Sequence, residues 1–252
     1  MLSVLAVVLT FASGGLDVVI YARLGNVFAS VMTGNIVVFG LALARGSLSL
    51  GLHTGAAVCG YVAGVAAGAR FDSRRTRDAS ATGSAWPPRV LSVLLAELTL
   101  LAGFVIGWEV AGFHPAGAGQ IVMLVVAACA MGLQSAAVVQ MNLGSVSTTY
   151  LTGTLTSLVG SLVRQEAASR GAAGLRRPGV LLGLLAGATL AGLLVAYSDA
   201  IAPVPSLLAI TLGAVLASGR PRRGGRIGPA RSNRLRDRPG GAHQVTAQYL
   251  RD

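Results

Sequence analysis

Long apolar runs are the feature that most restricts how this chain can fold. A helix needs about 20 consecutive apolar residues to cross the hydrocarbon core of a bilayer. The composition agrees with such crossings, because 53% of residues are hydrophobic, 12% are charged and the mean hydropathy is +0.68, a combination outside the range of water-soluble domains. We therefore predict an all-α integral membrane protein with apolar segments near residues 2–22, 25–44, 48–69, 90–111, 120–141, 143–163, 179–198 and 203–219.

The basic charge of the chain is concentrated at its C-terminal end. Residues 220–252 carry nine Arg against two Asp, which leaves only +4 of the net charge of +11 elsewhere. A Pro/Gly-rich basic segment of this kind is typical of a disordered cytoplasmic tail that meets anionic lipid. Nucleic-acid binding is not expected, since no stacking aromatics alternate with these arginines. We predict a polytopic membrane domain at 1–219 followed by a disordered tail.

Arginines between the apolar runs indicate which connections face the cytoplasm, because short Arg-rich loops stay inside. Residues 70–89 hold five Arg and 164–177 hold four, whereas 112–118 and 199–202 hold none. Two apolar runs separate the Arg-free loop at 112–118 from the Arg-rich loop at 164–177. Two full crossings would return the chain to the outside, so one of these runs cannot be a simple span.

Two polar, glycine-containing elements identify the runs that stop short. Residues 32–35 read Met-Thr-Gly-Asn, and a degraded copy at 151–154 reads Leu-Thr-Gly-Thr; we call these the Thr-Gly elements. Irregular backbone inside a membrane is tolerated only where protein or water satisfies it, and paired interruptions in the two halves of a transporter point to its binding site. We predict about six transmembrane helices plus two re-entrant or broken helices at the Thr-Gly elements.

The sequence around these elements indicates an internal duplication. Gly-Leu-Asp at 15–17 precedes the first element much as Gly-Leu-Gln at 132–134 precedes the second. Repeat one then covers about 2–111 and repeat two about 119–219.

The direction of equivalent spans distinguishes two kinds of duplication. With the Arg-rich loops inside, the span at 48–69 runs inward and its equivalent at 179–198 runs outward, which predicts inverted repeats. The alternative of eight full crossings in parallel repeats stays open, although it places one Arg-rich loop outside.

The same motifs give the chain a resemblance to the YoaK family of bacterial inner-membrane proteins, over roughly residues 2–219. The most specific part is the Phe-x-x-x-Met-Thr-Gly-Asn pattern within 27–35, supported by 15–17, 132–134 and 148–154. Ser135 stands where the family has Asn. The family is often described as predicted small-molecule permeases, so the resemblance implies a multi-pass permease of the bacterial cytoplasmic (inner) membrane.

A permease with its solute site at the two Thr-Gly elements is the predicted function. Glycine lets backbone groups open toward a cavity, and neighbouring Thr and Asn side chains coordinate cations or bond polar solutes. The competing interpretation is that these residues only permit close helix crossing and cap a half-helix. The candidate solute- or ion-binding residues are Asp17, Thr33, Gly34, Asn35, Gln134, Thr149, Thr152, Gly153 and Thr154.

Two carboxylates within apolar spans are candidates for coupling to a proton or cation. Asp17 and Glu97 are costly to bury in a membrane and mark ion sites or proton relays by default. The structural alternative for Asp17 is a buried partner for Arg23 or Tyr21, and Glu97 has a purely structural alternative as well.

Other residues are assigned structural roles. Cys59 and Cys129 are expected to be small buried packing residues, and Trp108 and Glu109 to be ordinary interfacial residues at a span end. Small residues at every fourth position are expected to form helix packing surfaces, at Gly60, Gly64 and Gly68 and at Gly183 and Gly187.

Enzymatic chemistry is not expected. The three histidines are scattered, and no metal-ligand spacing or nucleophile elbow occurs in the sequence, so we predict no metal, no cofactor and no catalytic residues. The remaining classes are a permease or channel, and a membrane sensor or partner protein that moves no solute. The expected partners are the lipid bilayer and a small solute, with a proton or cation as a candidate co-ligand, and a homo-oligomer stays open.

Overall fold

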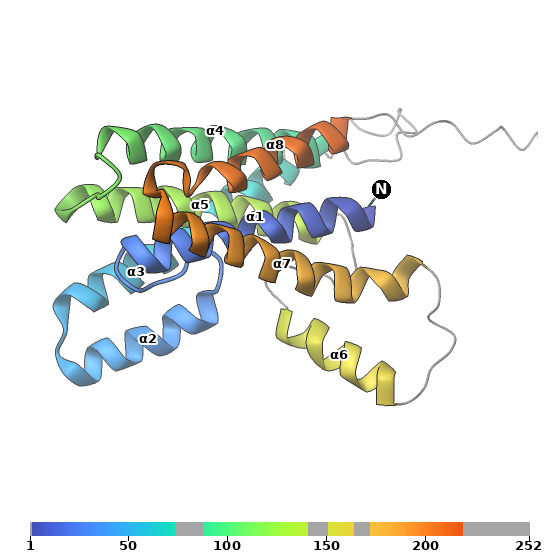
Figure 1. Cartoon of the computed structure of the whole chain (residues 1–252), viewed down its shortest axis with the longest axis horizontal. Helices are drawn as coiled ribbons and strands as arrows, with labels where there is room; N and C mark the ends of the chain where they lie inside the picture. The colour runs from blue at the N-terminus through green and yellow to red at the C-terminus, as the bar shows by residue number, and fades with distance from the viewer. Residues whose placement is uncertain (1, 74–87, 141–150, 164–171, 219–252) are drawn as a thin grey trace, which may run out of the picture. The chain divides into compact units, whose positions relative to one another are not determined.

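Six long helices form the main body of the protein in a computed structural model, which describes residues 2–73, 88–140, 151–163 and 172–218. Figure 1 shows these helices side by side, and the described residues contain no strand. Each long helix is apolar enough to cross a membrane. For α8 the candidate span also includes the short 3-10 helix η3 (Asp199–Ile201) that precedes it. They are α1 (Leu2–Arg23), α3 (Leu48–Ser73), α4 (Pro88–Val110), α5 (Gly117–Gln140), α7 (Ala172–Tyr197) and α8 (Val204–Ser218).

Two shorter helices carry the Thr-Gly elements. α2 (Met32–Arg45) has 14 residues and α6 (Leu151–Val163) has 13, so each is about 20 Å long against a hydrocarbon core of about 30 Å. The predicted combination of six spans and two shorter elements is confirmed. The predicted apolar run at 25–44 is not one helix, because its first residues form a turn, and the part of the run at 143–163 that precedes residue 151 lies outside the described residues.

The connection from α1 to α2, residues 24–31, folds back along α1. Gly25 and Asn26 have φ angles of +98° and +58°, a left-handed conformation that ends a helix and turns the chain. By Ser30 the chain has returned to the level of Asp17, about 9 Å before the end of α1. α2 therefore begins part-way along α1, and we call residues 24–31 the re-entrant segment.

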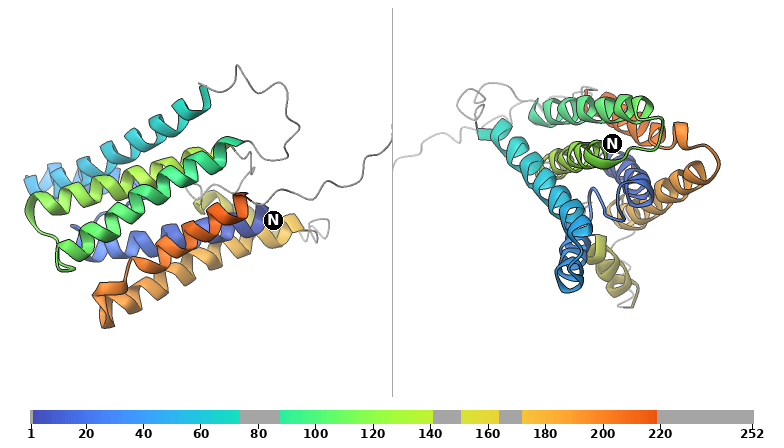
Figure 2. Two further views of the ribbon diagram at one scale, coloured as in Figure 1. Left: turned by 90° about the horizontal axis from the view of Figure 1, so that it is seen from above. Right: turned by 90° about the vertical axis from the view of Figure 1, so that its left-hand side faces the viewer.

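The helix contacts repeat when the two halves are exchanged. α1 packs along α7, and α3 packs along α5; α1 also packs on α8, and α5 on α4. The short helices obey the same exchange, because α2 lies on α3 and α6 lies on α7. Replacing α1 to α4 by α5 to α8 thus returns the same set of neighbours, as expected of two structurally equivalent halves. Figure 2 shows the resulting bundle from two further sides.

Glycines form both of the closest helix crossings, as the small-residue spacing predicted. A Cβ atom on Gly60 of α3 would lie 2.8 Å from the Val125 carbonyl oxygen of α5. In the equivalent pair, a Cβ on Gly183 of α7 would lie 3.0 Å from the Val7 carbonyl oxygen of α1. Close backbone approach of this kind is how small residues stabilise helix pairs in membranes.

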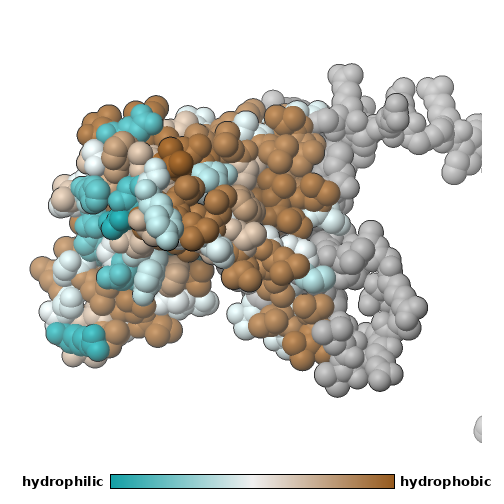
Figure 3. Space-filling model, in the orientation of Figure 1, coloured by the Kyte–Doolittle hydropathy of each residue, from teal (hydrophilic) through white to brown (hydrophobic). Residues whose placement is uncertain are grey.

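The outer surface of the bundle is apolar. Large side chains such as Val62, Leu95 and Leu182 are exposed, and Figure 3 shows apolar residues over much of the visible face, with hydrophilic ones gathered toward the end where α7 and α8 are connected. Such a surface suits contact with lipid. The expectation of two buried cysteines was wrong for Cys59, which is exposed because α3 lies at the edge of the bundle, whereas Cys129 is half-buried.

The ends of the helices show how the chain is threaded. The beginning of α3 lies near Arg23, because His53 of α3 contacts Gln120 and Gln120 bonds to Arg23. The end of α7 also lies beside Arg23, which bonds to the Val195 carbonyl oxygen. We call this the Arg23 end of the bundle. The end of α3 and the beginning of α7, which adjoin the two Arg-rich connections, therefore both lie at the opposite end of the bundle.

Candidate functional site

Asp17 fixes the re-entrant segment through hydrogen bonds to both of its carboxylate oxygens. Its Oδ1 accepts bonds from the backbone N–H groups of Ala29, at 2.7 Å, and Ser30, at 2.8 Å. Its Oδ2 accepts a bond from the Ser30 hydroxyl. Asp17 is only 5% exposed, so three donors compensate for its removal from water. The carboxylate acts as an anchor that holds the start of α2 part-way along α1.

Asn35 supports the same segment from the other side. Its Oδ1 accepts a bond from the Phe28 N–H at 2.9 Å, and its Nδ2 donates to the Phe28 carbonyl oxygen at 2.7 Å. The side chain is fully buried. Both hydrogen-bonding edges of the Asn35 amide are therefore engaged with the backbone of the re-entrant segment, and Asp17 and Asn35 converge on residues 28–30.

Two backbone N–H donors in the first turn of α2 have no partner in the part of the chain that the structure describes. Val31 occupies the N-cap position without a side-chain hydrogen bond, and the N–H groups of Thr33 and Gly34 have no partner among the described residues. The Thr33 side chain is exposed, and Gly34 is half-buried. N–H groups at a helix start attract negative charge and carbonyl oxygens, so this turn is able to bind an electron-rich group of a solute.

The second Thr-Gly element is only partly comparable. Thr152 and Gly153 are exposed at the start of α6, whereas Thr154 is fully buried. The Thr156 hydroxyl donates to the Thr152 carbonyl oxygen at 2.9 Å. Thr149 lies outside the described residues. Thr152 and Gly153, the second and third residues of α6, are thus accessible in the way that Thr33 is in the first turn of α2.

Figure 1 shows how the two short helices lie relative to the bundle. Both lie on the same side of it, α2 beside the half toward the Arg23 end and α6 beside the other half. Each points its N-terminal end toward the middle of the bundle. The first turns of the two helices are therefore the parts nearer the middle of the bundle. These turns contain Thr33 and Gly34 in α2, and Thr152 and Gly153 in α6.

Gln134 belongs to a helix interface and not to either Thr-Gly element in the described part of the chain. Its Nε2 donates to the Leu9 carbonyl oxygen at 2.9 Å, and its Oε1 accepts a bond from the Ser13 hydroxyl at 3.3 Å. The side chain is 1% exposed. Gln134 therefore joins α5 to α1 across the boundary between the two halves.

Glu97 differs from the other polar candidates because its carboxylate has no hydrogen-bond partner among the described residues. It lies on α4 and is fully buried. The geometry brings Asp17 and Asn35 together at the re-entrant segment and leaves Glu97 apart from them.

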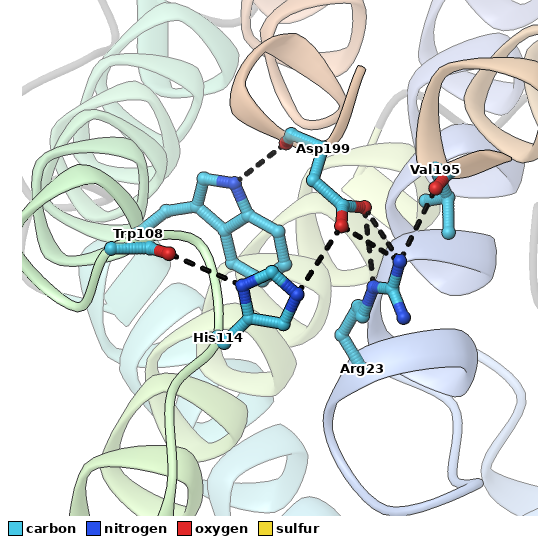
Figure 4. A network of polar contacts seen from close by, with 6 residues as sticks. Arg23, Trp108, His114, Val195 and Asp199 are labelled. Carbon is cyan, nitrogen blue, oxygen red and sulfur yellow. Dashed lines mark hydrogen bonds and ion pairs between the residues drawn. The ribbon is translucent and has the colours of Figure 1, made fainter. Parts of the chain in front are cut away.

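A charged cluster at the Arg23 end joins α1 and α4 to the connection between α7 and α8 (Figure 4). The Arg23 guanidinium bonds to both carboxylate oxygens of Asp199, at 2.9 and 2.7 Å from Nη2, and to the Val195 carbonyl oxygen at 3.2 Å. His114 Nε2 lies 3.5 Å from Asp199 Oδ2, and Trp108 Nε1 donates to the Asp199 carbonyl oxygen at 2.9 Å. η3 is thereby held to α1 and α4.

The family can now be assigned from comparisons with known proteins. A family model described as "Protein of unknown function (DUF1275)" matches residues 5–217. This chain belongs to that family. The UPF0700 transmembrane protein YoaK of Bacillus subtilis (strain 168) is 30% identical over 151 residues, which cover 60% of this chain and 63% of the relative's own length. No solved structure matches the chain.

Membership confirms the predicted YoaK-like family. With six apolar helices of sufficient length, this DUF1275 protein is a multi-pass membrane protein, and the bacterial cytoplasmic (inner) membrane is the location that fits it.

The charged cluster corrects two sequence predictions. Arg23 was a candidate partner for Asp17, but its partner is Asp199, which lies 176 residues away along the chain. Trp108 was expected to be an ordinary interfacial residue, but it is fully buried, with a carbonyl partner for its indole N–H and its ring stacked on Phe104. The only sequence signal for the pair was that two opposite charges each end an apolar run.

A second polar contact at this end links α3, α5 and the re-entrant segment. Gln120 Nε2 donates to the Arg23 carbonyl oxygen at 2.9 Å, and its Oε1 lies 3.0 Å from His53 Nε2. His53 Nδ1 lies 2.7 Å from the Ser49 carbonyl oxygen. Gly25 is required here, since a Cβ atom would lie 2.5 Å from the His53 ring. These bonds close the Arg23 end of the bundle.

Proposed function

We propose that the protein is a small-molecule permease made of two inverted repeats, with its solute site at the first turns of α2 and α6. Two observations support the repeats: the helix contacts are preserved when the halves are exchanged, and each half has one short helix beside three long ones. Discontinuous helices that start near the midplane are the usual binding elements of such transporters.

The open first turn of α2 is the observation that carries the proposal. Asp17 and Asn35 position this turn part-way along the bundle, and the N–H groups of Thr33 and Gly34 are left without partners among the described residues. Unpaired donors at membrane depth are costly unless a ligand or water meets them. Because helix starts favour negative charge, the proposed solute is small and carries a carboxylate or carbonyl group.

Asp17 has a positioning role in this proposal. Its carboxylate oxygens are occupied by three donors of the re-entrant segment, so it holds the binding turn and does not itself contact solute. The competing function is a membrane sensor or partner protein that moves no solute, and it is favoured by the same saturation of Asp17 and Asn35, which a purely structural turn would also have.

Uptake into proteoliposomes tests the proposal. The full chain is reconstituted and offered a panel of labelled small carboxylates, amino acids and neutral polar solutes. Replacement of both exposed hydroxyls, Thr33→Val with Thr152→Val, removes two hydrogen-bonding groups from the proposed site. We expect uptake of the transported solute to fall about tenfold, as loss of one or two hydrogen bonds to a ligand predicts.

A matched control separates this effect from general damage. Thr99 is an exposed threonine on α4 whose hydroxyl donates to the Leu95 carbonyl oxygen, and Thr99→Val should transport like the unmodified protein. Normal uptake by the double variant would place the solute site elsewhere. Absence of uptake for the whole panel by a folded, monodisperse protein would favour the sensor function.

A further inference from the structure

Glu97 is a buried carboxyl group for which the described residues provide no counter-charge. It is fully buried in α4, and neither Oε1 nor Oε2 has a hydrogen-bond partner among the described residues. An isolated ionised carboxylate is strongly disfavoured in such surroundings, whereas a neutral carboxylic acid is tolerated far better. The side chain therefore needs a bound proton or another cation whenever the bundle is closed around it.

Few titratable side chains lie on the helices packed against α4 in the described part of the chain. α5 contains a single titratable side chain, the Cys129 thiol, and α8 contains none. Glu109, at the far end of α4 itself, is exposed and about 18 Å along the helix from Glu97. α3 also contacts α4. Among its described titratable side chains, His53 and Tyr61 bond to other groups, and Cys59 and Arg70 are exposed.

Helix register places Glu97 near the middle of the bundle. α4 and α5 are antiparallel neighbours in which Gly107 lies against Met123, and Val93 packs with Leu133 and its neighbours. Glu97 precedes Gly107 by ten residues, and Leu133 follows Met123 by ten residues, so Glu97 and Leu133 lie at the same level in the antiparallel pair. Glu97 is thus level with the part of α5 where Gln134 joins α1, in the central part of the span Val90–Val110.

We propose that Glu97 is a proton-binding site at the centre of the membrane domain. The closed bundle holds the carboxyl group in its protonated form, and the proton leaves only when α4 separates from α5 or α8 far enough to admit water. Proton binding and closure of the bundle are then thermodynamically linked, since each favours the other. The site takes a proton whatever solute the protein carries, so it stands independently of the proposed permease site.

Chemical labelling with dicyclohexylcarbodiimide tests the protonation of Glu97. This apolar reagent takes the proton of a carboxylic acid and bonds to its oxygen, and the product rearranges to a stable N-acylurea. It therefore marks protonated carboxyl groups in apolar surroundings and leaves ionised ones unmodified. In the full chain in lipid nanodiscs at neutral pH, we expect one adduct by intact mass, located on Glu97 by peptide mapping, and none on Glu97→Gln.

Two variants serve as controls for the site of labelling. Asp17→Asn should label like the unmodified protein, because the Asp17 carboxylate is saturated by donors. Glu109→Gln should also label normally, since Glu109 is exposed. An adduct that persists in Glu97→Gln and disappears in Asp17→Asn would overturn the proposal and give the protonated group to Asp17.

Infrared spectroscopy provides a measurement that does not depend on access of the reagent. A protonated carboxyl group has a C=O stretch above the amide I band, and this band should be present in the unmodified protein and absent in Glu97→Gln. Identical spectra in this region for the two proteins would show that Glu97 is ionised, which overturns the proposal.

The choice between a proton and a metal cation is made with the same labelling reaction. The reaction is repeated at constant pH in sodium, potassium or choline chloride. Equal labelling in all three salts supports a proton site. Protection by sodium alone would overturn the assignment to a proton and give the site to a monovalent metal cation.

Discussion

Asp17 and Glu97 are both carboxylates within apolar helices, but the fold surrounds them in opposite ways. Asp17 receives three hydrogen bonds from the re-entrant segment, whereas Glu97 receives none from the described residues. The cost of burying the first group is offset by donors, and that of the second only by a bound proton or cation. The same side-chain chemistry thus anchors the backbone in one region and provides a titratable group in the other.

Removal of the Asp17 carboxylate should have the largest effect on stability. Asp17→Ala leaves the N–H groups of Ala29 and Ser30 and the Ser30 hydroxyl without their acceptor. Unpaired buried donors of this kind predict a loss of about 3–5 kcal/mol. The measurement is unfolding in mixed micelles with a rising fraction of sodium dodecyl sulfate. A loss below about 1 kcal/mol would mean that the re-entrant segment does not depend on Asp17.

Removal of the Asn35 amide should have the next largest effect. Asn35→Ala deletes both bonds to the Phe28 backbone, and we expect a loss of about 2–3 kcal/mol. Asp17 and Asn35 hold the same few residues, so the double variant should lose less than the sum of the single losses. Strict additivity in a double-mutant cycle would contradict the view that the two side chains act on one segment.

The ion pair at the Arg23 end should contribute less than either buried anchor. Asp199→Asn keeps the shape of the side chain but removes the charge that faces Arg23. The side chains of Arg23 and Asp199 are 31% and 19% exposed, so solvent screening limits the expected loss to about 1 kcal/mol. High salt should reduce the difference between the two proteins. A loss as large as that of Asp17→Ala would mean that the cluster is the main closure of the bundle.

Replacement of Glu97 should have the smallest effect. Glu97→Gln is close in shape to the protonated side chain and carries no charge, so the free energy of unfolding should change by less than about 1 kcal/mol. The contrast with Asp17→Ala is measured in the same micelles. Strong destabilisation by Glu97→Gln would show that the carboxylate is ionised and paired, and the two carboxylates would then have similar roles.

Much of the architecture could be predicted because hydropathy is a property of consecutive residues. The apolar runs together with the Arg-rich loops predicted six spans, and the Thr-Gly elements predicted which two helices are short. The glycine spacing predicted the crossing surfaces, since a helix places every fourth residue on one face. The candidate site was predicted only as a set of residues: Thr33 and Gly34 proved open, whereas Asn35 and Gln134 are engaged with backbone groups.

The sequence by itself therefore determined which segments enter the membrane, where they are interrupted and which two carboxylates are costly to bury. Only the tertiary structure decided which of these carboxylates finds donors, that Arg23 pairs with Asp199, and that Trp108 is buried while Cys59 is not. The physical reason is the separation along the chain over which each effect acts. Hydropathy and helix periodicity add up locally along the chain, whereas the partners of Asp17 and Arg23 lie 12 and 176 residues away, and folding alone brings them within hydrogen-bonding distance.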